Sequence, residues 1–317
     1  MIYFATSITC FIHALRKLWL HLTLTKIQIS TVARMDYKHQ HFVTEAYLRA
    51  WYDPRTPKGY EPYVWMVSKK DRLAKKKSPK KIFREADFYT IVDSKGNRNV
   101  DLEKTLQTIE SEFITVRRDK IRHRQPLDAR EIGIVATFIA TMFARVKHQR
   151  NQQREMWRAL IDEMERAPAE VLTELTRTGA YKQISDLKSQ PLPYNIVNFT
   201  NIAVPFFSRM GCEILETETK PGFVTSDNPC FLIDPAIYTS NPPISWHQLF
   251  SSPTVEILFP ISPKQLISLK PAGPNRYVSV DKVPEAIDEV NKITLQNAEE
   301  FIVLNQEECK DIWFENI

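Results

Sequence analysis

The chain has 317 residues, of which 43% are hydrophobic and 26% are charged, and its formal net charge is +5. This composition is that of a globular protein with one large or two small domains, and it is far from that of disordered chains. Seven glycines stand against 20 prolines, and neither GxGxxG nor GxxxxGK occurs. Because such loops need glycine for a close approach of the backbone to phosphate, the sequence argues against dinucleotide-binding and P-loop folds.

Positive charge is concentrated in the first half of the chain. Residues 68–84 hold nine lysines and arginines against one acid, Asp71, and residues 117–124 and 145–154 are also basic. This asymmetry predicts a positive face that meets nucleic acid or another polyanion. The alternative is a solvated face with a disordered lysine-rich loop, which needs no partner.

The first 34 residues differ in character from the rest. Residues 1–15 are apolar, but Arg16 and Lys17 interrupt them well before the length of a bilayer span, so we expect no membrane span. A secretory signal would need a basic segment before them and a small-residue cleavage site after them. We therefore expect residues 1–34 to be upstream sequence or a weakly folded appendage, with a membrane-associated amphipathic segment as the alternative. Residues 35–317 are expected to form a single domain.

The cysteines indicate a cytoplasmic protein. Cys10, Cys212, Cys230 and Cys309 form no CxxC pair and have no histidine at the spacing of a zinc site. Cys212 and Cys230 could approach each other across a hairpin. Even so, such sparse use of cysteine is typical of reduced thiols in the cytoplasm.

The first elements expected along the chain are an aromatic strand at 63–67 and then helices. Residues 101–120 carry apolar side chains at helical spacing. The next helix is predicted over 127–150, with Asp128 as its N-cap and Glu131 three residues on, which is the pattern of a capping box. This helix is apolar on nearly all sides, as is typical of a buried helix.

The helical section continues and then gives way to strands. Two helices separated by Pro168 and another over 194–211 come first. A hairpin is predicted over 212–229 with its turn at 220–222. Two further strands are expected within 255–269, then a helix and a last strand at 301–304. This order predicts an α+β fold, in which a helical middle section packs on an antiparallel β-sheet from the C-terminal third and the N-terminal strand.

A His-x-His pair lies near the start of this domain. His39 and His41 would share a face if they lay on a strand, and histidines on one face can bind a metal ion. No third ligand is identifiable from the spacing. A histidine with a purely structural role is the alternative interpretation.

Two carboxylates lie two helical turns apart in the amphipathic helix over 101–120. Glu103 and Glu110 would therefore lie on roughly one side of this helix, where Asp101 and Glu112 are alternatives. They could serve a site. Exposed carboxylates that balance nearby arginines are the plainer interpretation.

A polar segment, Thr225-Ser226-Asp227-Asn228-Pro229, separates two apolar runs. Pro229 favours an extended backbone at Asn228, and either Asp227 or Asn228 could close an Asx-turn, so a turn explains the residue types. A carboxylate at the end of a strand is also well placed for catalysis or binding, because a rigid scaffold holds it.

The order of these motifs resembles that of a bacterial family of unknown function, domain family 4238. The resemblance rests on HFV with YL at 41–48, then IFREADFYT, LEKTLQTIE, GFVTSDNP and FPISP, over residues 39–304. It implies one fold, a bacterial cytoplasmic protein, and a signature that includes His41, Asp227 and Asn228, but no known reaction. Thr44 departs from the family pattern, which has proline after HFV.

We therefore expect a hydrolase that acts on nucleic acid or a nucleotide. Its catalytic residues would be His41 as base or metal ligand, Asp227 as acid, base or metal ligand, Asn228 as positioning amide, and Glu110. Any cofactor would be a divalent metal ion. Arg145 and Arg150 are the expected phosphate-binding residues.

The alternative function is a non-catalytic module that binds nucleic acid or a protein partner. Here the basic stretches at 68–84 and 117–124 would supply the phosphate contacts, and the polar segment around Asp227 would be structural.

Overall fold

A computed structural model describes residues 39–92, 97–177, 179, 181, 185, 191–235 and 246–315. The appendage expected at residues 1–34 lies outside these residues. The α-helices are α2 (Glu45–Leu48), α3 (Asp101–Asp119), α4 (Ala129–Ala144), α5 (Lys147–Glu165), α6 (Ala169–Arg177), α8 (Pro191–Phe207), α10 (Trp246–Phe250) and α11 (Pro284–Asn297). Short 3-10 helices are η1 (Arg49–Trp51), η2 (Pro79–Lys81), η3 (Ile121–His123) and η4 (Asp311–Phe314). Within the described part of the chain, no helix has both the length and the apolar character to cross a membrane.

Among the described residues, the strands fall into two larger sheets and two short pairs, and with the helices they form an α+β fold, as predicted. The strands are β1 (His39–His41), β2 (Val64–Ser68), β3 (Ala74–Lys77), β4 (Arg84–Ala86), β5 (Ile91–Val92), β6 (Arg98–Asn99), β7 (Gly211–Glu216), β8 (Thr225–Ser226), β9 (Phe231–Ile233), β10 (Glu256–Ser262), β11 (Gln265–Lys270), β12 (Arg276–Ser279) and β13 (Phe301–Leu304).

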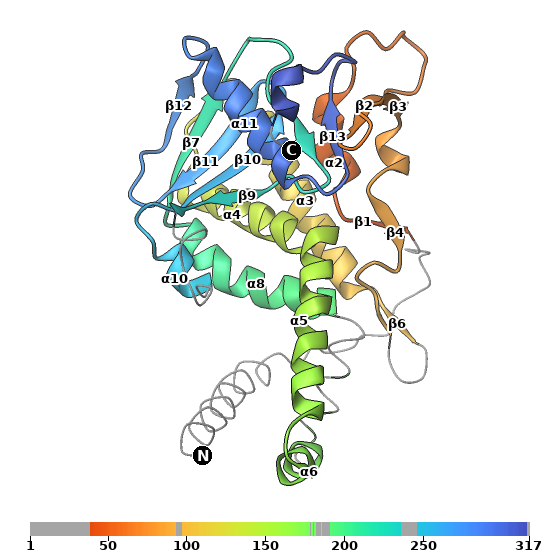
Figure 1. Ribbon diagram of the computed structural model, residues 1–317. Helices are drawn as coiled ribbons and strands as arrows, with labels where there is room; N and C mark the ends of the chain where they lie inside the picture. Colours follow the sequence, from red (N-terminus) through yellow and green to blue (C-terminus); the bar gives the residue numbers. More distant parts are fainter. Residues whose placement is uncertain are drawn as a thin grey trace. The chain divides into compact units, whose positions relative to one another are not determined.

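Strands of the C-terminal third form a five-stranded sheet in the order β12-β7-β11-β10-β9 (Figure 1). Its pairs are antiparallel except for β12, which runs parallel to β7, so the sheet is mixed rather than purely antiparallel. β10 and β11 are the two strands predicted within 255–269, and they pair with each other as a hairpin. The register shifts between Pro260 and Ser262, where proline offers no N–H to the ladder.

A four-stranded sheet, in the order β3-β2-β13-β8, joins the two ends of the domain. β2 lies antiparallel to β13, with Met66 opposite Val303. The short β8 pairs with the other side of β13, and Thr225 lies opposite Val303. β2, the strand predicted near the N-terminus, thus pairs with the C-terminal strand β13, as predicted. The two strands belong to a sheet that is separate from the five-stranded sheet.

Side chains alternate along the hairpin β10–β11 and divide the apolar core in two. Leu258 and Leu266 pack with Ile287 of α11. Ile257 and Phe259 instead belong to the large cluster that includes α3, α4 and α8. Because successive side chains of a strand point to opposite faces, α11 covers one face of the sheet and the helical section covers the other (Figure 1).

α4 begins as predicted and ends earlier than predicted. Asp128 Oδ1 accepts a hydrogen bond from Glu131 N at 2.8 Å, and Glu131 Oε2 accepts one from Asp128 N at 2.9 Å, which completes the capping box. The single helix expected over 127–150 was wrong. α4 stops at its C-cap Arg145, because Val146 has an extended backbone (ψ 161°) and serves as the N-cap of α5.

The hairpin predicted over 212–229 was also wrong. β7 pairs with β11 and β12 on its two sides, whereas β8 belongs to the other sheet, so the connection between them links two sheets. The chain does bend close to the predicted place, over residues 219–221. Gly222 has φ +76°, and a Cβ there would lie 1.9 Å from the carbonyl oxygen of Pro263. Cys212 and Cys230 are both buried free thiols.

Candidate functional site

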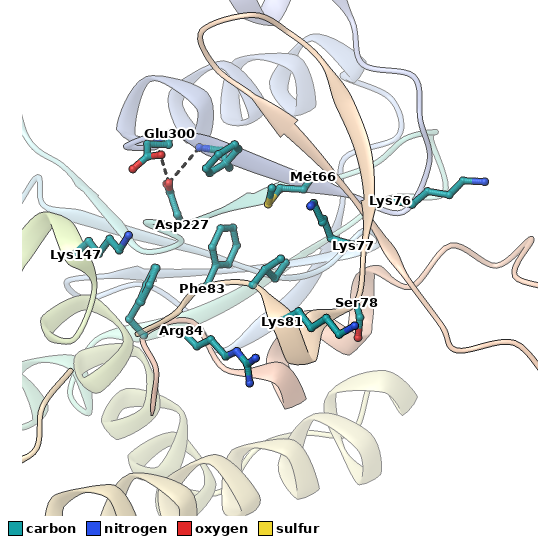
Figure 2. A pocket seen from close by; sticks show the side chains of 13 residues that line it. Met66, Lys76, Lys77, Ser78, Lys81, Phe83, Arg84, Lys147, Asp227 and Glu300 are labelled. Atoms are coloured by element: carbon teal, nitrogen blue, oxygen red, sulfur yellow. Dashed lines mark hydrogen bonds between the residues drawn. The ribbon is translucent and has the colours of Figure 1, made fainter. Parts of the chain in front are cut away.

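A cavity of about 460 Å³ lies between the four-stranded sheet and the segment that runs from the end of β3 through η2 into β4 (Figure 2). Its volume falls within the range of about 300–1,000 Å³ that is typical of small-ligand sites. Its lining combines cations, apolar side chains and two acids. The lining residues are Phe42, Met66, Lys76, Lys77, Ser78, Lys81, Ile82, Phe83, Arg84, Lys147, Asp227, Glu300 and Phe301.

The strand register decides which side chains of the sheet face this cavity. Met66 lies opposite Val303, and Phe301 is two residues from Val303, so Met66 and Phe301 share one face. Lys77 pairs with Val64 and therefore shares the same face. Lys76 pairs with Trp65 and points to the opposite face, where its ammonium lies 5.1 Å from the centroid of the Trp65 ring.

The cavity therefore gathers cations from four elements. Lys77 ends β3, Lys81 ends η2, Arg84 begins β4 and Lys147 begins α5. Lys147 lies 3.9 Å from Glu85 and over the ring of Phe42. Within the described residues, Lys77, Lys81 and Arg84 have no carboxylate at ion-pair distance. This is an excess of uncompensated positive charge around one concave space.

Phe83 forms part of the wall in an unusual backbone conformation. Its φ is +53°, a region that bulky residues rarely adopt and that costs about 1–3 kcal/mol. The carbonyl oxygen of Phe83 accepts a hydrogen bond from Phe42 N at 2.8 Å, which ties this turn to the end of β1. Backbone strain of this kind is concentrated at binding and catalytic sites, where the surrounding fold sustains it.

Asp227 reaches the cavity but is also engaged by the backbone. Its Oδ1 accepts a hydrogen bond from Glu299 N at 2.9 Å, and its Oδ2 accepts from Glu300 N at 2.8 Å and Phe301 N at 3.1 Å. Figure 2 draws the contacts to the last two residues. Burial raises the pKa of Asp227 to about 6 despite these donors. The carboxylate therefore fastens the loop between α11 and β13.

Asn228 has a similar structural role. Its side-chain amide donates to the carbonyl oxygen of Asn297 at 2.9 Å, at the end of α11, and its backbone N–H donates to Ser226 Oγ at 3.1 Å. Both bonds satisfy groups that a helix end and a tight turn would otherwise leave unpaired. The side chains of Asp227 and Asn228 thus have structural roles, but they bond to residues 297–301 rather than closing the local Asx-turn considered above.

His41 lies on β1, opposite Arg84 on β4, and is not among the residues that line the cavity. Its Nε2 is buried and makes no hydrogen bond. Burial, aided by the Arg84 guanidinium, lowers the pKa of His41, so the imidazole is mostly neutral at pH 7. Within the described part of the chain, no three His, Cys, Asp or Glu residues are grouped to hold a metal ion, so His39 and His41 lack the further ligands such a site needs.

Glu110 and Arg145 meet, but away from the residues of the cavity. Arg145 Nη1 donates to Glu110 Oε1 at 2.7 Å, and the Arg145 side chain is fully buried. Burial raises the pKa of Glu110, while Arg145 opposes this shift. Tyr89, which donates to the His41 carbonyl oxygen at 3.4 Å, interacts with Glu103 in the same buried group. This placement gives Arg145 a structural pairing and does not support a phosphate contact.

Arg150 is held beside β4. Its Nη1 donates to Glu85 Oε1 at 2.6 Å, and its guanidinium lies 4.4 Å from the centroid of the Phe88 ring. Only 12% of its side chain is exposed. Arg150 therefore neighbours Lys147 through their shared partner Glu85, without lining the cavity itself.

The two basic stretches have different structures. Much of 68–84 is ordered as β3 and η2, and it supplies most of the cavity's cations, so it is not the disordered loop considered above. In 117–124, Arg117 turns inward and donates to the carbonyl oxygen of Ile261 at 3.2 Å. Arg124 pairs with Glu216 at 2.8 Å. Two of the basic residues in the second stretch thus make contacts within the protein and are not free to bind a ligand.

Sequence reasoning missed Lys147 and the aromatic wall of the cavity. Lys147 lies in the basic segment 145–154, from which only Arg145 and Arg150 were selected because arginine suits phosphate. Phe83 carries no sequence signal for its positive φ. The segment 68–84 was the correct signal for Lys77, Lys81 and Arg84, since its charge density is unusual.

Segments with the family signature meet inside the fold. The hydroxyl of Tyr47 lies 2.6 Å from Thr225 Oγ1 and donates to the carbonyl oxygen of Pro260 at 2.7 Å. Thr44, which replaces the expected proline, caps α2 by accepting a hydrogen bond from Tyr47 N at 3.0 Å. The departure from the pattern therefore keeps the start of α2 fixed by another means.

Comparisons with known proteins add the family and no reaction. No curated protein matches this chain, and no solved structure matches it. The model of one family, described as protein of unknown function (DUF4238), matches residues 39–308. This range covers most of the chain and includes every residue that lines the cavity. The chain belongs to the DUF4238 family of proteins of unknown function.

Proposed function

We propose that this protein binds a phosphate-bearing ligand, a nucleic acid or a nucleotide, in the cavity between the four-stranded sheet and η2–β4. The observation that carries the proposal is the grouping of Lys77, Lys81 and Arg84 around one concave space without a carboxylate partner among the described residues. Clustered like charges repel one another, and an anionic ligand relieves this repulsion.

The N-terminus of α5 adds positive potential at the side of the cavity where Asp227 and Glu300 lie (Figure 2). Lys147 is its first residue, no side chain caps the N-terminus, and the first turn holds no acid. The positive end of the helix dipole therefore adds to the ammonium of Lys147. The guanidinium of Arg84 suits a phosphate because its donors match two oxygens at once.

The contacts of Asp227 favour binding over catalysis. Three backbone N–H groups already occupy its carboxylate, and the amide of Asn228 is bound to the end of α11. His41 lies outside the cavity lining. Of the four groups expected to act in hydrolysis, Asp227 and Asn228 thus have structural roles, and His41 and Glu110 lie outside the cavity lining.

Binding of fluorescent single-stranded DNA and of a fluorescent ATP analogue, followed by anisotropy as salt rises, tests the proposal. We expect affinity to fall steeply with salt, because phosphate contacts release counterions. Replacing Lys81 by Gln should weaken binding about tenfold, the value of one charge-assisted hydrogen bond. The matched control is Lys80→Gln, whose exposed side chain lies next in the chain but outside the cavity lining. Equal loss in both variants, or no binding to either probe, would refute the proposal.

A hydrolase acting on nucleic acid or a nucleotide is the second candidate, and one observation favours it. Asp227 borders the same cavity as the cations, and its pKa, raised to about 6, lies near the range useful for proton transfer at neutral pH. Product analysis with DNA, RNA and nucleotides, with Mg²⁺ or Mn²⁺ added, tests this candidate. A wild-type protein that binds these substrates but leaves all of them intact would exclude it.

We also infer that the protein works in the bacterial cytoplasm. The free thiols of Cys212, Cys230 and Cys309 support this location, because a reducing compartment preserves them. Labelling of unfolded protein from intact cells with a thiol reagent would test it, and oxidised cysteines would contradict it.

A further inference from the structure

We infer that the occupant of the cavity is a single nucleotide rather than a stretch of nucleic acid strand, an inference that rests on the proposed binding of phosphate. The two ends of the cavity differ in chemistry. Asp227 and Glu300 lie at one end, where the neighbouring Lys147 is already 3.9 Å from Glu85, whereas Ser78 and Lys81 lie at the other end and Phe83 lies between them (Figure 2). A ligand that fits must be anionic at one end only.

The acidic end argues against a polynucleotide. A strand crossing the cavity would carry phosphates beyond both ends, and one of them would lie beside Asp227 and Glu300. A phosphate beside these two carboxylates would be repelled by their negative charge, so binding of a strand across the cavity is disfavoured. A nucleotide instead carries all its negative charge on one side, where Lys81 and Arg84 lie.

Glu300 has the character of a specificity residue for an uncharged polar group. Its side chain is exposed, and its carboxylate has no hydrogen-bond or ion-pair partner among the described residues. A carboxylate accepts hydrogen bonds only, so it suits the exocyclic amine of a base or the hydroxyls of a ribose. Asp227, already holding three N–H groups, would add negative potential rather than a new contact.

The middle of the cavity is apolar on two sides. Met66 and Phe301, both half-buried, present apolar surface from the sheet, and Ile82 and Phe83 form the facing wall. Flat bases gain affinity from such surroundings through van der Waals contact and loss of water. The strained backbone of Phe83 fixes this wall before a ligand binds, which reduces the ordering cost of binding.

Calorimetry with the full chain tests the inference, using the four nucleoside monophosphates, ribose 5-phosphate and a single-stranded oligodeoxynucleotide without terminal phosphates. Ribose 5-phosphate has the same phosphate and sugar but no base. We expect at least one nucleoside monophosphate to bind about tenfold or more tightly than ribose 5-phosphate and more tightly than the oligonucleotide.

Two variants locate the effect. Met66→Gln should weaken binding of that nucleotide while leaving ribose 5-phosphate unchanged. Met156→Gln, an exposed methionine on α5 outside the cavity lining, should change neither affinity. Ribose 5-phosphate equal to every nucleotide, or an oligonucleotide that binds best, would overturn the inference and leave the proposed phosphate binding intact. If no phosphate probe binds, both fall.

Discussion

The hydroxyl of Tyr47 lies 2.6 Å from Oγ1 of Thr225, 178 residues along the chain. Tyr47 has one hydroxyl hydrogen and donates it to the carbonyl oxygen of Pro260, so Thr225 is the donor in the first bond. Three segments on which the resemblance to the family rests thus meet at one fully buried phenol. This phenol is a structural junction between the two sheets, since Thr225 belongs to β8 and Pro260 to β10, and the cavity lies beside it.

Replacing Tyr47 by Phe should destabilise the protein. The change leaves the carbonyl oxygen of Pro260 and the hydroxyl of Thr225 without this partner in a buried region, at a cost of about 2–3 kcal/mol. Chemical denaturation would measure the free energy of unfolding. Tyr60→Phe is the matched control, because Tyr60 is 73% exposed, and it should change stability by less than about 0.5 kcal/mol. Equal stability of the two variants would contradict the junction.

Asp227→Asn should loosen the loop between α11 and β13. Asparagine has one acceptor oxygen in place of two. Its NH₂ group would face backbone N–H groups whose hydrogen bonds are now accepted by the second carboxylate oxygen. We expect a loss of about 1–3 kcal/mol in the free energy of unfolding. Faster amide hydrogen exchange at Glu299, Glu300 and Phe301 should accompany the loss. Unchanged exchange at these residues would show that the carboxylate does not hold the loop.

The raised pKa of Asp227 predicts a pH dependence of stability. Its folded value of about 6 exceeds its ordinary value of 3.8, so the folded state holds the proton more tightly than the unfolded state. Stability from this group is present below pH 4 and is lost as pH rises towards 6, by up to about 3 kcal/mol. Denaturation at a series of pH values, with Asp227→Asn as reference, isolates the contribution. If the stability of the wild type relative to Asp227→Asn instead increased as pH rises from 4 to 6, the raised pKa would be contradicted.

Replacing Glu110 by Gln should lower the free energy of unfolding, because Arg145 would then be buried without its ion-pair partner. The guanidinium is fully buried and would lose its paired charge, which costs about 3 kcal/mol or more. Glu112→Gln is the control on the same helix, because Glu112 is exposed and lies 3.9 Å from Arg130. Chemical denaturation of both variants would measure their free energies of unfolding, and we expect only Glu110→Gln to be clearly less stable than the wild type. If Glu110→Gln is as stable as the control, Arg145 does not depend on this carboxylate.

Local patterns in the sequence predicted most of the helices and the longest strands. The capping box at Asp128 and Glu131 forms as expected, because both of its hydrogen bonds are made within one helical turn. The hairpin of β10 and β11 also follows from short-range pairing. These features depend on neighbours in the chain, which sequence patterns describe well.

Long-range pairing was beyond the same reasoning. The segment after β7 passes to another sheet because β11 and β12 occupy both sides of β7, and no residue near Gly222 signals this. The contacts of the site residues could not be predicted for the same reason. Asp227 was identified by its type, but its three backbone donors come from residues 299–301, which the sequence places more than 70 positions away.

Calorimetric titration at low salt measures directly whether the cations of the cavity bind phosphate. The probes are the nucleoside monophosphates and ribose 5-phosphate, added to the wild-type chain, Arg84→Gln and the control Lys80→Gln. We expect Arg84→Gln to weaken binding about tenfold or more for every probe that binds, and Lys80→Gln to bind like the wild type. Equal affinity of the wild type and Arg84→Gln would contradict it.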